Sequence, residues 1–102
     1  MNRVKETPTL NELRAFRGDI LHLADQYGAF DVRVFGSVAR GEATPDSHID
    51  LVMCFQPTTS MFDLVGLWLD LQELLGREVS LLDEAALDDQ FKENVNRDAV
   101  PL

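Results

Sequence analysis

The sequence contains a single cysteine and no long apolar run. Because Cys54 has no partner for an internal disulfide, the cysteine content is that of a protein from a reducing compartment. No apolar stretch reaches the roughly 18 residues that a membrane-spanning helix needs. The N-terminus also lacks the apolar segment of a signal peptide. These absences predict a cytoplasmic protein that binds no membrane.

Basic residues are also scarce, with nine Lys and Arg against eighteen Asp and Glu and a net charge of −9. Nucleic-acid backbones attract Lys and Arg, so this balance argues against general nucleic-acid binding, although a local basic site could hold one nucleotide. Acidic residues dominate the region after residue 82. They form either a solvated face that aids solubility or a surface that attracts a basic partner protein.

The length of 102 residues predicts one domain, residues 1–102, with one modest core. Apolar residues recur at steps of three and four in two segments and alternate or cluster in others. They predict helices over residues 9–27 and 60–75, and strands over residues 31–35, 49–55 and 78–82. We expect the middle strand to be buried on both faces.

Capping residues mark where these helices begin and end. Thr9 and Glu12 fit a capping box, and Gly28 is a natural stop. Ser60 and Asp63 suggest a second cap, and Asp83 is expected to begin a last helix. The resulting order, α-β-β-α-β-α, predicts an α/β (α+β) fold in which a small mixed sheet is flanked by helices.

Residues 34–51, VFGSVARGEATPDSHIDL, carry the chemistry. Gly36 lets the chain turn sharply after a strand, and the backbone N–H groups that follow Ser37 suit a phosphate. Arg40 would add positive charge for the phosphate, and Gly41 allows the chain to leave this turn. After a loop that contains Ser47, the next strand begins.

His48 and Asp50 are two residues apart on that next strand, so they share one face and form a pair of potential metal ligands. Taken singly, the glycines could simply make a tight connection, and Asp50 could be an edge residue. The complete arrangement of strand, Gly-Ser turn, loop, acid and strand is much rarer by chance.

This segment closely resembles the Gly-Ser and Asp-x-Asp signature of the minimal nucleotidyltransferases (MNT, antitoxin-like), within the DNA polymerase beta superfamily. The resemblance implies a nucleotidyltransferase fold that uses Mg²⁺ or Mn²⁺ with ATP or another nucleoside triphosphate. It also implies a catalytic, metal-binding carboxylate at Asp50. The residues that it implies for nucleotide binding are Gly36, Ser37, Arg40, Gly41 and Ser47.

Two positions depart from the family pattern. His48 stands where the family has the first aspartate, and Ser80 stands where it has the third carboxylate, so the ligand charge falls from −3 to −1. Imidazole serves Mg²⁺ poorly and would suit Mn²⁺ or Zn²⁺ better. Glu78 lies on the same strand face as Ser80 and is the candidate replacement ligand. We therefore expect weak or absent catalysis with a retained nucleotide cradle.

The family resemblance also implies a partner, because short members are commonly paired with a helical ribonuclease of the HEPN type. Some members transfer adenylate from ATP to a tyrosine of that partner. Our first hypothesis is an antitoxin-like protein that binds its HEPN toxin and keeps residual nucleotide binding. The alternatives are an active enzyme that transfers a nucleoside monophosphate to a protein or small-molecule hydroxyl, and a nucleotide sensor without turnover. Homo-oligomerisation stays open.

Four further expectations concern residues outside the motif. Cys54 is expected to be a small core residue, Trp68 to lie in the core, and His22 to be solvated. A second apolar strip on the helix over 60–75 comprises Phe62, Val65 and Leu69. It either contacts the last helix or forms a partner surface.

Overall fold

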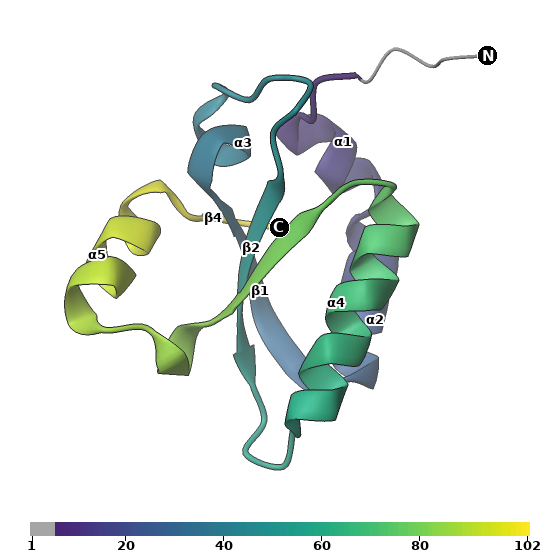
Figure 1. Cartoon of the computed structure of the whole chain (residues 1–102), viewed down its shortest axis with the longest axis vertical. Helices are drawn as coiled ribbons and strands as arrows, with labels where there is room; N and C mark the ends of the chain where they lie inside the picture. The colour runs from purple at the N-terminus through teal and green to yellow at the C-terminus, as the bar shows by residue number, and fades with distance from the viewer. Residues whose placement is uncertain (1–5) are drawn as a thin grey trace.

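The computed structural model describes residues 6–102, and its centre is a four-stranded sheet in the order β3-β2-β1-β4 (Figure 1). The strands β1 (Ala29–Phe35) and β2 (Ile49–Phe55) pair antiparallel. The strand β3 (Val79–Asp83) pairs parallel with β2, and the short β4 (Val100–Pro101) pairs antiparallel with β1. The expected mixed sheet flanked by helices is therefore confirmed.

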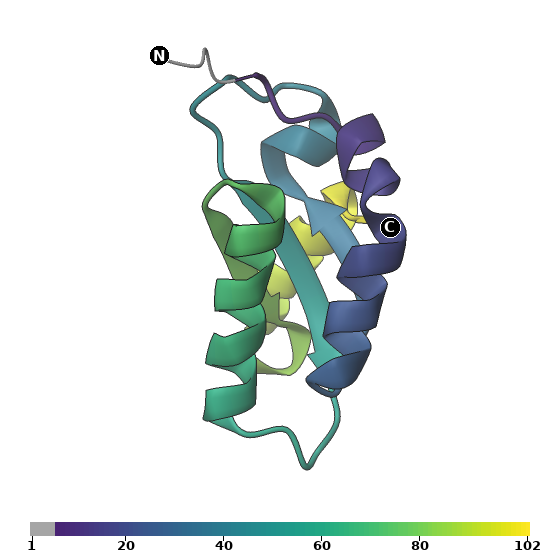
Figure 2. The same cartoon turned by 90° about the vertical axis from the view of Figure 1, so that its right-hand side faces the viewer.

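The two faces of the sheet are covered by different helices. Figure 2 shows α2 (Arg17–Gln26) and α4 (Met61–Leu75) side by side on one face, with α5 (Asp89–Asp98) on the other. The helix α4 connects the parallel strands β2 and β3, a connection that a tight turn could not make. A one-turn helix, α3 (Gly36–Arg40), follows β1 directly.

The core lies between the sheet and the helices α2 and α4. Alternate residues of β2 point into it and meet the inner side of α4, where Leu67 and Leu71 are fully buried. Val52, which points to the opposite face of β2, is also fully buried. This confirms that β2 is a central strand buried on both faces. Trp68 does not fit the prediction, because it is 36% exposed and its Nε1 donates to the Val79 carbonyl oxygen at 2.7 Å.

The expected helix over residues 9–27 is two helices, α1 (Leu10–Ala15) and α2. Its predicted cap is confirmed, because the Thr9 hydroxyl accepts from the Glu12 N–H at 3.1 Å. The break falls at Phe16, whose ψ of 8° leaves the helical region. At this break the Arg17 guanidinium donates to the Leu102 carbonyl oxygen at 3.0 Å, which joins the first helices to the end of the chain. His22 is exposed, as predicted.

The cap of α4 is confirmed in full, with Ser60 and Asp63 bonded reciprocally. The prediction that Asp83 begins the last helix is wrong. Asp83 instead caps a short 3₁₀ turn, η1 (Glu84–Ala86), and Asp88 caps α5 by accepting from the Phe91 N–H at 2.7 Å. A single acid three residues before an apolar residue fits both positions, so the sequence alone does not separate them.

No helix within residues 6–102 combines the length and the apolar character that a membrane span requires.

Candidate functional site

The end of β1 and the start of β2 bring Gly36 and Asp50 together. Phe35 is paired with Asp50 in the sheet register, so the Gly-Ser turn that follows Phe35 lies beside the Asp50 carboxylate. Gly36 has a φ of 72°, a region that favours glycine, and a Cβ at this position would collide with Asp50 Oδ2. Glycine is therefore required at position 36 for two reasons: its φ is positive, and the Asp50 carboxylate leaves no room for a Cβ.

The turn itself is the five-residue helix α3, with Ser37 half-buried in its first turn. Val38 is buried and anchors this turn to the core. Gly41 ends the helix in the left-handed conformation, with a φ of 74°. Both predicted glycines thus stand at positive φ, and Ser37 lies directly between Gly36 and the buried anchor.

Asp50 is a half-buried carboxylate whose partners supply little positive charge. Burial raises its pKa, while a hydrogen bond from the Ser80 hydroxyl and the charges of His48 and Arg40 act in the opposite direction. Ser80 lies directly across from Asp50 in the parallel pairing of β2 with β3. Since burial outweighs the other effects, the pKa of Asp50 lies above its ordinary value and its charged form is less favoured than in water.

Glu78 lies against His48 rather than against Asp50. Its Oε2 is 2.7 Å from His48 Nε2, and both side chains are exposed. They line a pocket of about 180 Å³ together with Asp46, Ser47 and Arg77. Glu78, the candidate replacement ligand, is therefore already engaged with the imidazole.

Ser47 and Arg77 hold the loop that leads into β2. The Ser47 hydroxyl accepts from the Thr44 N–H at 2.8 Å. The Arg77 guanidinium donates to the carbonyl oxygens of Pro45 at 2.6 Å and of Ser47 at 3.2 Å. Arg77 was not predicted as part of the site, because a lone arginine after a helix-ending glycine carries no motif.

Arg40 is held by two acids. Its guanidinium lies 3.0 Å from Glu42 Oε2 and 2.9 Å from Asp98 Oδ2, and these hydrogen bonds raise its pKa. Asp98 belongs to α5, so this pair fixes the last helix beside the Gly-Ser turn. The sequence does not predict this pair, because its two residues are 58 positions apart and share no motif.

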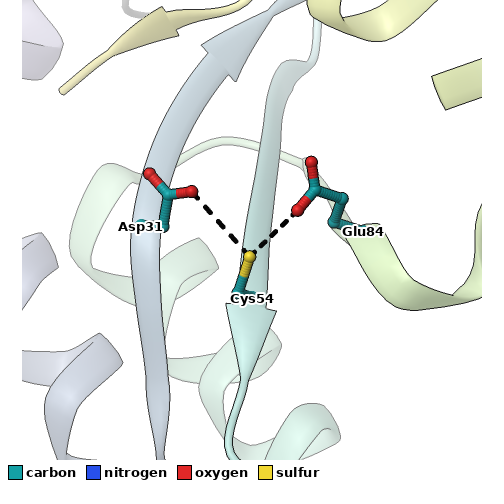
Figure 3. A group of neighbouring side chains, drawn as sticks. All are labelled: Asp31, Cys54 and Glu84. Atoms are coloured by element: carbon teal, nitrogen blue, oxygen red, sulfur yellow. Dashed lines mark hydrogen bonds between the residues drawn. The ribbon is translucent and has the colours of Figure 1, made fainter. Parts of the chain in front are cut away.

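A second polar cluster lies on β1, β2 and η1, at Asp31, Cys54 and Glu84 (Figure 3). The prediction that Cys54 is a core residue is wrong, because its Sγ donates to Glu84 Oε2 at 3.1 Å and approaches Asp31 Oδ2 at 3.8 Å. Arg33 supplies the balancing charge, at 3.1 Å from Glu84 and 3.6 Å from Asp31. Because a cation already lies among these acids, the cluster is best explained as a structural network.

The thiol in this network is expected to react slowly with alkylating reagents. Burial, and then the hydrogen bond and charge of Glu84, raise the pKa of Cys54 to about 11. Since only the thiolate reacts, the rate of iodoacetamide modification should keep rising above pH 9. Glu84→Gln should shift this profile to lower pH. A native-state profile with its midpoint near pH 8.5 would contradict the described environment.

The comparisons with known proteins identify the family and agree with the fold. Residues 20–102 match the family described as Polymerase beta, Nucleotidyltransferase. A relative from Thermococcus cleftensis, named protein adenylyltransferase MntA, is 33% identical over 76% of this chain and 79% of its own. A solved structure described as a "putative minimal nucleotidyltransferase" is 44% identical, covers 93% of this chain and 97% of its own, and has a TM-score of 0.84.

The fold recurs in more distant structures. One is described as a tri-AMPylated Shewanella oneidensis HEPN toxin in complex with MNT antitoxin, with 17% identity, a TM-score of 0.67, and coverage of 86% of this chain and 69% of that one. At this identity the likeness shows the fold alone. The family match spans the Gly-Ser turn, Asp50 and all four strands, and from this we conclude that the chain belongs to the polymerase beta nucleotidyltransferase family.

Proposed function

We propose that this chain is the antitoxin-like partner of a HEPN-type toxin, and that it neutralises the toxin by binding, with weak or absent nucleotidyl transfer. The partner is proposed from the relatives, which are named MntA and described as an MNT antitoxin in complex with a HEPN toxin. The predominance of binding over transfer rests on one observation. Asp50 has a hydroxyl across from it at Ser80 and an imidazole two residues before it at His48.

These residues do not fit two magnesium ions. Two-metal catalysis needs carboxylates that hold both cations about 4 Å apart, and Mg²⁺ prefers oxygen ligands in near-octahedral geometry. Asp50 supplies one carboxylate, while Glu78 is paired with His48 at 2.7 Å. His48 would favour Mn²⁺ over Mg²⁺, so manganese is the better candidate for any residual metal binding.

The nucleotide cradle is proposed to persist without efficient transfer. Gly36 keeps the turn open beside Asp50, and Gly41 and Ser47 bound the adjoining loop. Ser37 offers its hydroxyl and its N–H group in the first turn of α3. A bound triphosphate would compete with Asp98 for the Arg40 guanidinium, which lies 2.9 Å from that acid. We therefore expect nucleotide binding to be weak and to depend on salt.

The alternative is an active enzyme that transfers adenylate from ATP to a hydroxyl of a protein or a small molecule. It is favoured by the name of the 33% identical relative, protein adenylyltransferase MntA. It is also favoured by the second carboxylate, Glu78, on the face shared by His48 and Asp50. In that case a metal would have to separate the His48–Glu78 pair.

The two functions are separated by incubating the chain with labelled ATP, Mg²⁺ and the HEPN-type protein encoded beside it. We expect a stable complex and a labelling rate at least about 100-fold below that of a relative with all three acids, since single lost catalytic contacts already cost 10²–10³. Asp50→Ala is the matched control and should not lower the residual rate further. Robust labelling that Asp50→Ala abolishes would establish the alternative. No complex at all would overturn the proposed partner.

A further inference from the structure

The outer side of α4 carries an apolar surface that no part of residues 6–102 covers. Phe62 is 89% exposed, Met61 72% and Leu69 51%, while the inner residues Leu67 and Leu71 are fully buried. Spacings of three and four residues place the exposed side chains on one side of the helix. We call this surface the α4 strip, and its members are Met61, Phe62, Val65, Trp68 and Leu69.

The last helix does not cover the α4 strip. The alternative that the strip contacts this helix is wrong, because α5 packs on the opposite face of the sheet, against α3 and β1 (Figures 1 and 2). Contiguous exposed apolar patches bordered by polar residues are typical of interaction surfaces. The strip is therefore available to another molecule.

The neighbouring edge of the sheet argues for a helix as the occupant. An added strand would need the outward backbone groups of the edge strand β3. The backbone N–H and carbonyl groups of Val79 are already used, because the N–H donates to Gln72 Oε1 at 3.2 Å and the carbonyl accepts from Trp68 Nε1 at 2.7 Å. With strand addition blocked at this end, the strip offers a ridge of side chains of the kind that packs against another helix.

The charges on α4 argue against a second copy of this chain and for a basic partner. The charged residues within α4 are Asp63, Asp70 and Glu73, and residues 61–75 contain no Lys or Arg. Two copies meeting at their strips would bring like charges together on chains of net charge −9, which costs free energy. A partner with Lys and Arg around an apolar centre would gain from the same arrangement.

We infer that the α4 strip docks an amphipathic helix of the toxin partner, with an apolar face flanked by Lys and Arg. The inference rests on the proposed function and names the surface by which that function operates. Phe62 and Leu69 are the central anchors, since aromatic and aliphatic side chains that become fully desolvated dominate interface energies. Asp70 accepts from the Tyr27 hydroxyl at 2.5 Å, so exposed Glu73, four residues after Leu69, is the acid of α4 that borders the strip. Glu73 and the net charge of −9 steer the approach of a basic partner, so the association rate should fall as salt rises.

The test compares Leu69→Glu with the matched control Phe91→Glu. Phe91 is 45% exposed on α5, on the other side of the sheet. Binding to the purified HEPN-type protein is measured by calorimetry, with thermal melting as the folding check. We expect at least about 100-fold weaker binding for Leu69→Glu and a less than threefold change for Phe91→Glu. Phe62→Ser, at an 89% exposed position, repeats the test should Leu69→Glu melt early.

The outcomes separate the inference from the function on which it rests. Failure of the unaltered chain to bind the HEPN-type protein overturns the proposed function and the inference with it. Unchanged binding by folded Leu69→Glu and Phe62→Ser overturns the inference alone. A loss confined to Phe91→Glu moves the contact to α5 and also overturns it. The inference is also overturned if the unaltered chain self-associates, Leu69→Glu abolishes this self-association, and toxin binding is unchanged. The occupant of the α4 strip would then be a second copy of this chain.

Discussion

Replacing His48 and Ser80 together by aspartate is expected to create a site that binds Mg²⁺ and that stabilises the folded protein when it is filled. The double variant should melt about 5 °C or more higher in millimolar Mg²⁺ than in chelator, and the unaltered chain should show no such rise. Ser80 lies directly across from Asp50, and His48 shares its strand face. The two changes therefore place new carboxylates beside the existing one, where a divalent cation relieves their repulsion.

The same double variant should transfer adenylate to the HEPN-type protein at least about 100-fold faster than the unaltered chain. Adding Asp50→Asn is the control, and it should remove both the melting response and the transfer. The melting response is informative by itself, because it needs neither ATP nor an acceptor. A double variant that folds and ignores Mg²⁺ would show that His48 and Ser80 are not what limits metal binding.

Replacing Gly36 by alanine is expected to destabilise the fold by about 3 kcal/mol and to abolish nucleotide binding. A residue with a Cβ costs about 1–2 kcal/mol in the left-handed region, and Gly36 has a φ of 72°. The added Cβ would also collide with Asp50 Oδ2. Since the collision is with the carboxylate itself, its relief moves the Asp50 side chain and so disturbs the site. Urea unfolding and titration with a fluorescent ATP analogue measure the two effects.

Alanine substitutions at two other glycines distinguish the free-energy cost of the left-handed backbone from the cost of the collision with Asp50. Gly41 has a φ of 74°, and a Cβ added there would meet no atom within 4 Å, so Gly41→Ala should cost only about 1 kcal/mol. Gly18 is the second residue of α2 with open space around it, and Gly18→Ala should stabilise by about 0.5 kcal/mol. Equal losses for Gly36→Ala and Gly41→Ala would contradict the described contact with Asp50.

Strong local signals made most of the fold predictable. The continuous apolar run of β2 and the Ser60–Asp63 capping box identify the buried strand and α4 correctly. The break at Phe16 and the strand β4 were not predictable in this way. Both depend on tertiary contacts of the chain end, such as the Arg17 bond to the Leu102 carbonyl, and a periodic pattern does not contain them.

The candidate site was predictable where it depends on spacing along adjacent strands, and not where it depends on partners from elsewhere. The convergence of Gly36 with Asp50 follows from a strand on either side of the turn. The pairing of Arg40 with Asp98, 58 residues further along the chain, does not. Cys54 was misplaced because an apolar run hides which face of β2 meets Arg33 and Glu84.

Inhibition of the partner by binding and inhibition by covalent modification are distinguished by a ribonuclease titration. RNA cleavage by the HEPN-type protein is followed with increasing amounts of this chain, with and without ATP and Mg²⁺, and the toxin is then weighed by mass spectrometry. If the proposed function is right, inhibition is complete without ATP, it is reversed when the chain is removed, and the toxin mass is unchanged. Inhibition that requires ATP and Mg²⁺, survives removal of the chain and leaves covalent adenylate on the toxin would contradict the proposed function.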